Sequence, residues 1–133
     1  MKTKLTSLAL ASLLMSSGAT YAEWSANVGV TNNYLWRGLT QSINEPAIQG
    51  GIDYASDSGF YVGTWASNVS YDSDDAYSYE HDMYFGYAWE AGGVSYDLSY
   101  LYFNYDENAG YDFGEVTAAI GYGNFSASIS LLT

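Results

Sequence analysis

A single arginine and four acids are the residues of this sequence whose types and spacing could do chemistry. Two lysines, Lys2 and Lys4, lie at the N-terminus, and the remaining basic residue is Arg37, against 15 acids in the chain. Alternation along the predicted strands places Arg37 on the polar side together with Asp53, Asp82, Asp97 and Glu115. We expect these side chains to face a water-filled lumen, where charged groups attract or repel ions. Arg37 should then lie close to at least one carboxylate.

Arg37 has two interpretations. An arginine that faces lipid costs about 2–4 kcal/mol at the middle of a bilayer, so the polar side is its expected place. There it could tune which ions pass, or it could form an internal salt bridge that stiffens a narrow barrel. We favour the salt bridge. The acids either give a channel a preference for cations or are solvated residues without a transport role, and the sequence does not decide between the two.

Other kinds of site are poorly supported. The chain has no Cys, which excludes thiolate metal ligands, Cys nucleophiles and disulfide bonds. Its one histidine, His81, falls on the apolar side, without the paired Ser and acid that a lipid-modifying enzyme would use. The acidic residues Asp72, Asp74 and Asp75 lack the Gly and the distal Glu of a calcium loop. We therefore predict no catalytic residue, no metal and no cofactor, and do not expect an enzyme.

The elements that position these side chains are recognised by strict alternation. In residues 24–31, apolar side chains alternate with small or polar ones, which is the period of a strand with one apolar and one polar side. The same parity continues to Tyr34 and Trp36 on the apolar side and to Arg37 on the polar side. We therefore expect one long strand from residue 24 to residue 41, bent or bulged at Asn32 and Asn33.

Further strands are expected along the rest of the chain, at residues 47–55, 60–69, 80–89, 94–105, 114–122 and 125–131. The strand at 60–69 is ambiguous in parity, since Phe60 and Val62 alternate with Tyr61 and Trp65. Short turns are expected at 42–46, 56–59, 90–93 and 123–124, and longer acidic loops at 70–79 and 106–112. Outer-membrane barrels combine short periplasmic turns with longer outside loops, so the first strand should rise from the periplasm.

The N-terminus predicts export from the cytoplasm. Lys2 and Lys4 precede a mostly apolar run at residues 5–15, which is too short to cross a bilayer as a helix. Small residues follow at 16–22 and end in a cleavage site after Ala22, with Ala19 as the second choice. We therefore divide the chain into a signal peptide, residues 1–22, and one outer-membrane β-barrel domain, residues 23–133.

Composition agrees with a barrel and argues against a nucleic-acid partner. Aromatic residues make up 18% of the sequence, and barrels gather such residues in belts at the two membrane interfaces. We expect the tryptophans in these belts: Trp24, Trp36, Trp65 and Trp89. The formal net charge is −12, and loss of the two lysines makes it −14, so the contacts to phosphate that nucleic acids require are not expected.

The predicted fold is all-β, an antiparallel up-and-down transmembrane β-barrel or an incomplete part of one, with about seven strands. Single-chain bacterial barrels close with an even number of strands. Seven strands leave two edges whose backbone groups lipid cannot satisfy. Either the chain is part of a longer protein or it needs a second copy of itself, and we favour the first interpretation.

Three segments carry a resemblance to a known family: YLWRGLTQS, PAIQGGIDY and SGFYVGTWASNV. They resemble the N-terminal part of the TorF family of bacterial outer-membrane porins, over residues 21–105. Its most specific positions here are Arg37, Gly38, Pro46, Gly50, Gly51, Gly63 and Trp65. The resemblance implies an outer-membrane location and a porin role, and it supplies no catalytic residue. Family members are longer than this chain, which bears on how the barrel closes.

These observations leave three functional hypotheses. The first is an outer-membrane porin for passive diffusion of small solutes, with a bias toward cations. The second is a non-conducting structural or adhesive barrel that acts through its acidic loops, and the third is a soluble periplasmic β-sandwich that binds a ligand. The expected partners are outer-membrane lipid, the barrel-assembly machinery and small solutes, with a homo-oligomer as an open alternative.

Overall fold

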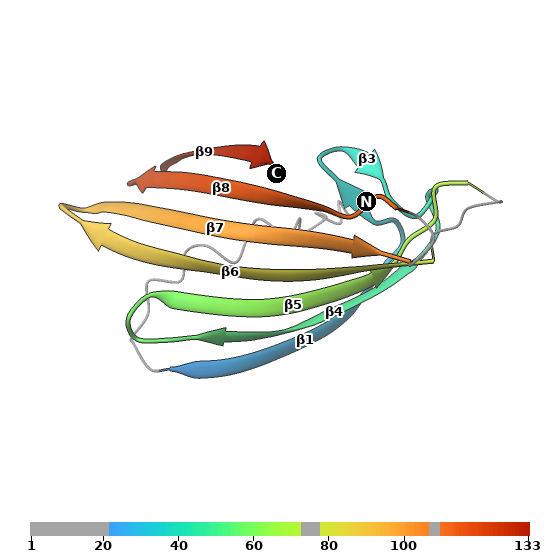
Figure 1. The fold of residues 1–133 in the computed structure, drawn as a ribbon, viewed down its shortest axis with the longest axis horizontal. Coiled ribbons are helices and arrows are strands. Elements are labelled where there is room, and N and C mark those ends of the chain that lie inside the picture. Colours follow the sequence, from blue (N-terminus) through green and yellow to red (C-terminus); the bar gives the residue numbers. More distant parts are fainter. Residues whose placement is uncertain (1–21, 73–77, 107–109) are drawn as a thin grey trace, which may run out of the picture.

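The chain folds into one strongly curved antiparallel sheet, as seen in a computed structural model that describes residues 22–72, 78–106 and 110–133 (Figure 1). The main sheet contains seven strands in the order β1-β4-β5-β6-β7-β8-β9, and β2 and β3 form a separate two-stranded hairpin. The strands are β1 Glu23–Thr31, β2 Leu35–Trp36, β3 Leu39–Thr40, β4 Ala47–Ala55, β5 Phe60–Asn68, β6 Tyr79–Ala91, β7 Val94–Tyr105, β8 Phe113–Tyr122 and β9 Phe125–Leu132. The predicted signal peptide lies outside the described residues, apart from Ala22.

Most strand predictions are confirmed to within one or two residues. β4 and β7 have the predicted bounds, and β5, β6, β8 and β9 differ from the prediction only at their ends. The tight connections are also confirmed, because Gly92, Gly93 and Gly123 take positive φ values of 62°, 77° and 57°. Two-residue hairpin turns whose twist matches the strands need such conformations, and glycine adopts them without strain.

The prediction of one long first strand is wrong. β1 ends at Thr31, and the chain then turns into the β2–β3 hairpin before β4 begins. The Thr31 hydroxyl donates to the Asn33 carbonyl at 3.0 Å, and Asn33 Nδ2 donates to Asn44 Oδ1 at 3.0 Å, so both ends of the connection are tied together. Local side-chain hydrogen bonds of this kind compete with a strand ladder, and they explain why alternation does not continue through Asn33.

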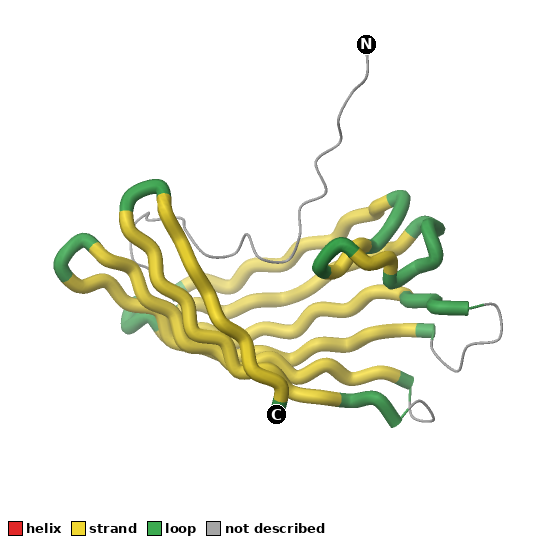
Figure 2. The backbone as a smooth tube through the Cα atoms, turned by 90° about the horizontal axis from the view of Figure 1, so that it is seen from above, coloured by secondary structure: helices red, strands yellow, loops and turns green. Residues whose placement is uncertain are grey.

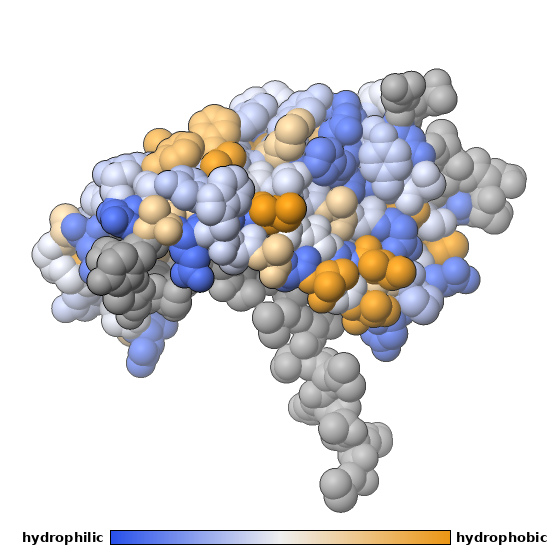
Figure 3. Space-filling model, turned by 90° about the horizontal axis from the view of Figure 1, so that it is seen from below, coloured by the Kyte–Doolittle hydropathy of each residue, from blue (hydrophilic) through white to orange (hydrophobic). Residues whose placement is uncertain are grey.

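The curved sheet forms an open trough, and the hairpin lies over its concave side (Figure 2). The apolar side of the alternation forms the other, convex face. There the large apolar side chains are exposed along every main strand, for example Val28 (82% exposed), Ile52, Phe85, Leu98 and Ile129. Apolar patches are visible on the surface in Figure 3. The parity of β5 is resolved by its register, since Val62 pairs with Phe85 on the convex face.

The buried core lies between the hairpin and the concave face. It consists of Tyr34, Ala47, Trp65, Val69, Phe103 and Tyr105. Tyr34 meets Trp65 edge-on with ring centroids 5.4 Å apart, and Trp36 meets Phe103 at 5.7 Å. Two predictions for these aromatic residues are therefore wrong. Tyr34 and Trp36 do not lie on the apolar convex face, and Trp65 is buried instead of lying in an outer belt, whereas Trp24 and Trp89 are exposed.

The sheet is not closed into a barrel. Its edges are β1 and β9, which are separated by the five other main strands in the hydrogen-bonding order. The predicted all-β antiparallel architecture is thus confirmed, whereas closure is not seen. No second layer of strands covers the convex face within the described ranges, as a β-sandwich would require. The same ranges contain no helix of the length and apolarity needed to cross a membrane.

Candidate functional site: a charged, tyrosine-rich concave face

The tip of the β2–β3 hairpin places Arg37 against a carboxylate of the main sheet. Arg37 and Gly38 occupy the two turn positions, with φ values of 48° and 87°. Arg37 Nη2 lies 2.7 Å from Glu115 Oε1 on β8, and its guanidinium lies 4.9 Å from the centre of the Trp36 ring. The prediction that Arg37 approaches a carboxylate is confirmed. Its predicted place on a strand is wrong, because the residue reaches the concave side from a turn.

The other predicted acids lie on the same concave face but are not paired with Arg37. Asp53, Gly63, Tyr84, Leu101 and Glu115 are directly opposite one another across β4 to β8, so their side chains share this face. Asp82 and Asp97 are on the same side and are buried. Among the described residues the ion pair of Arg37 is with Glu115, and none joins it to the three aspartates.

Tyrosine hydroxyl groups donate to one oxygen of each of two of these aspartates, while the other oxygen of Asp97, Oδ1, is buried without a hydrogen-bond partner in the described part of the chain. The Tyr84 hydroxyl donates to Asp53 Oδ1, and the Tyr61 hydroxyl donates to Asp97 Oδ2 at 2.8 Å. Each tyrosine ring reaches its partner by crossing a neighbouring strand. A neutral donor stabilises a carboxylate without cancelling its charge. Apart from the pairing of Arg37 with Glu115, no basic side chain in the described part of the chain pairs with the acids of the concave face.

Glycines make these crossings possible. A Cβ at Gly63 would lie 2.6 Å from Asp53 Oδ1 and would overlap the Tyr84 ring. A Cβ at Gly86 would likewise overlap the Tyr61 ring. Aromatic side chains commonly lie over glycines in curved sheets. The glycine at position 63 thus has a physical role, which is to let Tyr84 reach Asp53.

The remaining positions of the resemblance are mostly structural. A Cβ at Gly50 would meet the Asn27 carbonyl oxygen at 2.7 Å, and one at Gly51 would meet the Thr64 carbonyl oxygen at 2.6 Å. Pro46 precedes β4, and its carbonyl accepts a hydrogen bond from Asn68 Nδ2 at 3.3 Å. These residues hold β4 close to its neighbours, whereas Arg37, Gly38 and Trp65 belong to the hairpin and its docking surface.

Glu80 belongs to the site, and the sequence analysis did not single it out. Glu80 and Asp82 are adjacent concave-side positions of β6, and both are buried. The Tyr34 hydroxyl donates to Glu80 Oε1 at 2.7 Å, whereas neither carboxylate oxygen of Asp82 has a hydrogen-bond partner in the described part of the chain. Alternation along the strands could have predicted Glu80 as a concave-side residue. Tyr61, Tyr84 and Glu80 all alternate with apolar residues of the convex face.

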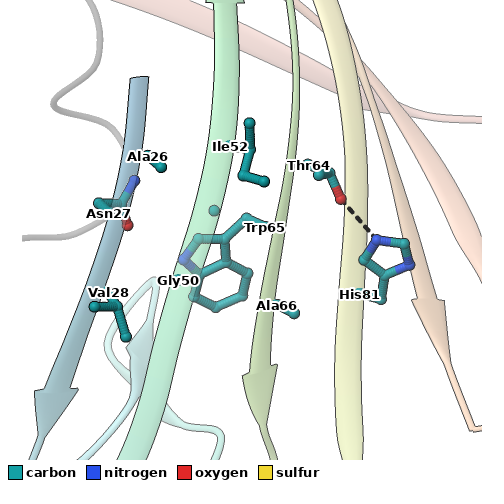
Figure 4. A pocket seen from close by; sticks show the side chains of 10 residues that line it. Ala26, Asn27, Val28, Gly50, Ile52, Thr64, Trp65, Ala66 and His81 are labelled. Atoms are coloured by element: carbon teal, nitrogen blue, oxygen red, sulfur yellow. Dashed lines mark hydrogen bonds between the residues drawn. The ribbon is translucent and has the colours of Figure 1, made fainter. Parts of the chain in front are cut away.

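His81 lies on the opposite, convex face, as predicted from its parity. Its Nε2 is 2.6 Å from Thr64 Oγ1, and Figure 4 shows the two side chains turned toward each other from β6 and β5. They border a shallow hollow of about 540 Å³, which also includes Val28, Gly50 and Ile52. Alternation turns the adjacent acids Glu80 and Asp82 to the concave face, so these do not form a catalytic arrangement with His81.

Two aspartates outside the strands organise the ends of the loops. Asp106 accepts hydrogen bonds from the Ser78 amide at 3.0 Å, the Ser78 hydroxyl at 2.6 Å and the Tyr79 amide at 2.9 Å. Burial alone would raise the pKa of Asp106, but these hydrogen bonds outweigh it and hold the pKa below its usual range. The Tyr105 amide, followed by the Asn104 and Tyr102 side chains, also lowers the pKa of Asp112.

Within residues 22–72, 78–106 and 110–133, no group of three or more His, Asp or Glu side chains could hold a metal ion. Asp74 and Asp75 of the acidic 70–79 segment lie outside the described residues.

Fold and site together define a class: a single-layer curved antiparallel sheet with an apolar convex face and a charged concave face that holds a docked hairpin. The chain belongs to a bacterial family described as "Bacterial protein of unknown function (Gcw_chp)", whose model matches residues 15–132. No curated protein and no solved structure matches the chain.

Proposed function

We propose that this chain forms the wall of an outer-membrane β-barrel porin that lets small solutes diffuse and favours cations. The observation that carries the proposal is the opposite chemistry of the two faces. Val28, Ile52 and Ile129 are exposed on the convex face, while Asp82, Asp97 and Glu115 are buried on the concave face. Water-soluble domains bury the apolar face of a sheet against another layer. In an outer-membrane barrel, hydrocarbon covers that face instead.

The preference for cations follows from how the concave carboxylates are held. Asp53 and Asp97 accept hydrogen bonds from tyrosine hydroxyls, which are neutral donors, and no basic side chain pairs with them among the described residues. Negative charge that lines a narrow aqueous path raises the local concentration of cations and lowers that of anions. Arg37 offsets the charge of Glu115 alone.

Closure of the wall requires strands in addition to the seven of the main sheet. Successive main strands are antiparallel, so β1 and β9 run in the same direction. An added strand that runs opposite to β1 and β9 would form antiparallel pairs with both of these edge strands. Direct pairing of β1 with β9, within one copy or between two copies, would be parallel. An added strand from a longer wall satisfies the backbone groups with the arrangement common in outer-membrane barrels.

The N-terminal sequence and the resemblance to the TorF porins support the same location. A chain with the predicted signal peptide is exported, and the barrel-assembly machinery would then insert it into outer-membrane lipid. The three tight turns lie at one end of the sheet and the longer connections at the other. In outer-membrane barrels these are the periplasmic and external ends, respectively.

The proposal is tested by refolding the protein, together with the strands that close its wall, in detergent micelles and reconstituting it in planar bilayers. We expect heat-modifiable migration on a gel, as folded barrels give, followed by stepwise conductance. A salt gradient should then produce a reversal potential of the sign that indicates cation preference. A chain that remains soluble and folded without detergent would refute the membrane location. A chain that folds in micelles but never conducts would refute the porin role.

A non-conducting structural barrel is the second candidate, and the docked hairpin is the observation that favours it. Tyr34 and Trp36 pack on the concave face, and Arg37 pairs with Glu115. Such a plug would stiffen the wall while blocking it. The conductance measurement separates the two candidates, because the plugged barrel passes no current.

A further inference from the structure

The β2–β3 hairpin spans several strands of the concave face. The Tyr34 hydroxyl bonds to Glu80 on β6 at 2.7 Å, Trp36 packs on Phe103 of β7, and Arg37 pairs with Glu115 on β8. These are three neighbouring strands, so the hairpin lies across the trough and not along one strand (Figure 2). An element in this position occupies space that a solute moving along the concave face would need.

The backbone of the hairpin turn directs the arginine at the sheet. Both turn residues have positive φ, as a type I′ turn requires, and Asn or Gly usually fills the first position. Arg37 is therefore in a conformation that costs energy for a residue with a Cβ. Its ion pair with Glu115 and its contact with the Trp36 ring offset this cost. Non-glycine residues held in such conformations cluster at functional sites.

Pairing with Glu115 leaves much of the Arg37 side chain exposed on the concave face. The Glu115 side chain is 5% exposed, whereas 56% of the Arg37 side chain remains exposed. The other concave acids Asp53 and Asp97 are bonded to tyrosine hydroxyls and not to a second basic side chain among the described residues. The balance between attraction and repulsion of ions at the hairpin therefore depends on one side chain.

We propose that the β2–β3 hairpin is the constriction of the lumen and that Arg37 is its selectivity-determining residue. The inference rests on the proposed porin function and goes further by assigning the constriction to one hairpin and its charge balance to one ion pair. Arg37 limits the preference for cations, and Glu115 both anchors the hairpin and contributes to that preference. Loss of either partner breaks the same ion pair at the hairpin tip, but the two losses change the charge of the constriction in opposite directions.

The test compares Arg37→Gln with Glu115→Gln in the reconstituted full chain. We expect Arg37→Gln to raise the cation-to-anion permeability ratio by about twofold or more and Glu115→Gln to lower it by a similar factor. Both variants should increase single-channel conductance, because both remove the ion pair that holds the tip of the hairpin on β8. Arg37→Lys keeps the charge and should retain a ratio near that of the wild type. Asp57→Asn, at an exposed acid of the turn between β4 and β5, should change neither quantity.

The outcomes separate the inference from the proposed function. Opposite shifts in the permeability ratio support Arg37 as the selectivity residue. If the wild type conducts and the two variants shift the ratio in the same direction or leave it unchanged, the inference is wrong while the porin function stands. If neither the folded wild type nor a variant with residues 35–40 replaced by a Gly-Ser linker conducts, the porin function itself fails, and the inference fails with it.

Discussion

The two faces of β6 differ sharply in the kind of residue that each one buries. Met83 and Phe85 on the convex face are about half exposed, whereas Glu80 and Asp82 on the concave face are almost fully buried. A soluble protein normally shows the reverse arrangement, since acids are almost never fully buried unless they are paired. The difference shows that the concave side buries acids beside its aromatic core, whereas no part of the described chain covers the apolar convex face.

The largest expected effect comes from emptying the concave core. Phe103 is 2% exposed and contacts Trp36 and Phe113. Phe103→Ala should therefore lower the free energy of unfolding by about 3–5 kcal/mol, because it removes ring contacts and leaves a cavity. Phe125→Ala, at an 82% exposed convex position, is the control and should cost much less. Denaturant titration in micelles measures both, and equal losses would contradict the assignment of the core to the concave side.

A charge introduced on one face and then on the other tests the comparison directly. Val28 and Asn27 are neighbours on β1, both exposed, and they point to opposite faces. We expect Val28→Lys to destabilise the membrane-inserted state by about 2–4 kcal/mol, because it places a charge in hydrocarbon, while Asn27→Lys is tolerated. The folded fraction of each variant is measured from its migration on a gel with and without heating. It should fall for Val28→Lys and stay near the wild-type fraction for Asn27→Lys. A soluble protein would tolerate both substitutions equally.

A smaller effect is expected from the glycine beneath the tyrosine–aspartate hydrogen bond. In Gly63→Ala the new Cβ would collide with the Tyr84 ring and the Asp53 carboxylate, at a cost of about 1–3 kcal/mol. Gly29→Ala is the matched control, since a Cβ there meets nothing within 4 Å. Unfolding titrations of the two variants should differ by this amount, and identical stabilities would mean that the crossing of Tyr84 over β5 contributes nothing.

The smallest expected effect is the pH-dependent loss of stability when Asp106, at the loop end of the sheet, loses its hydrogen bonds. The pKa of Asp106 is lower in the folded chain than its ordinary value of 3.8, so its hydrogen bonds add stability above that value. This stability is lost as the pH falls through the lower folded-state pKa. Asp106→Asn should therefore be less stable than the wild type by under about 1 kcal/mol at neutral pH, because water weakens hydrogen bonds to exposed groups.

The pH dependence is measured by unfolding both chains across the acidic range. The difference between wild type and Asp106→Asn should shrink as the pH falls and vanish at the acidic end. A difference that stays constant over the whole range would show that the carboxylate charge is not what holds Ser78 and Tyr79.

Alternation of apolar and polar residues was sufficient to predict strand ends and side-chain facing wherever one face of a strand carried one kind of residue. Alternation in residues 94–105 predicted both ends of β7, and the parity of Asp82 and Asp97 placed them on the polar side. The same rule failed after Thr31, because it treats each residue as part of a continuing strand. Side-chain hydrogen bonds at Asn33 and the turn at Arg37 end that continuity.

By itself the sequence determined the strands from residue 47 onward, the tight turns and the two kinds of face, because these follow from a period of two and from residues adjacent in the chain. Only the tertiary structure decided that Arg37 meets Glu115, that Tyr34 reaches Glu80 and that Tyr84 crosses Gly63 to Asp53. These contacts join residues 31 to 78 positions apart. These contacts depend on the curvature of the sheet and on the path of the β2–β3 hairpin, and local periodicity in the sequence predicts neither of them.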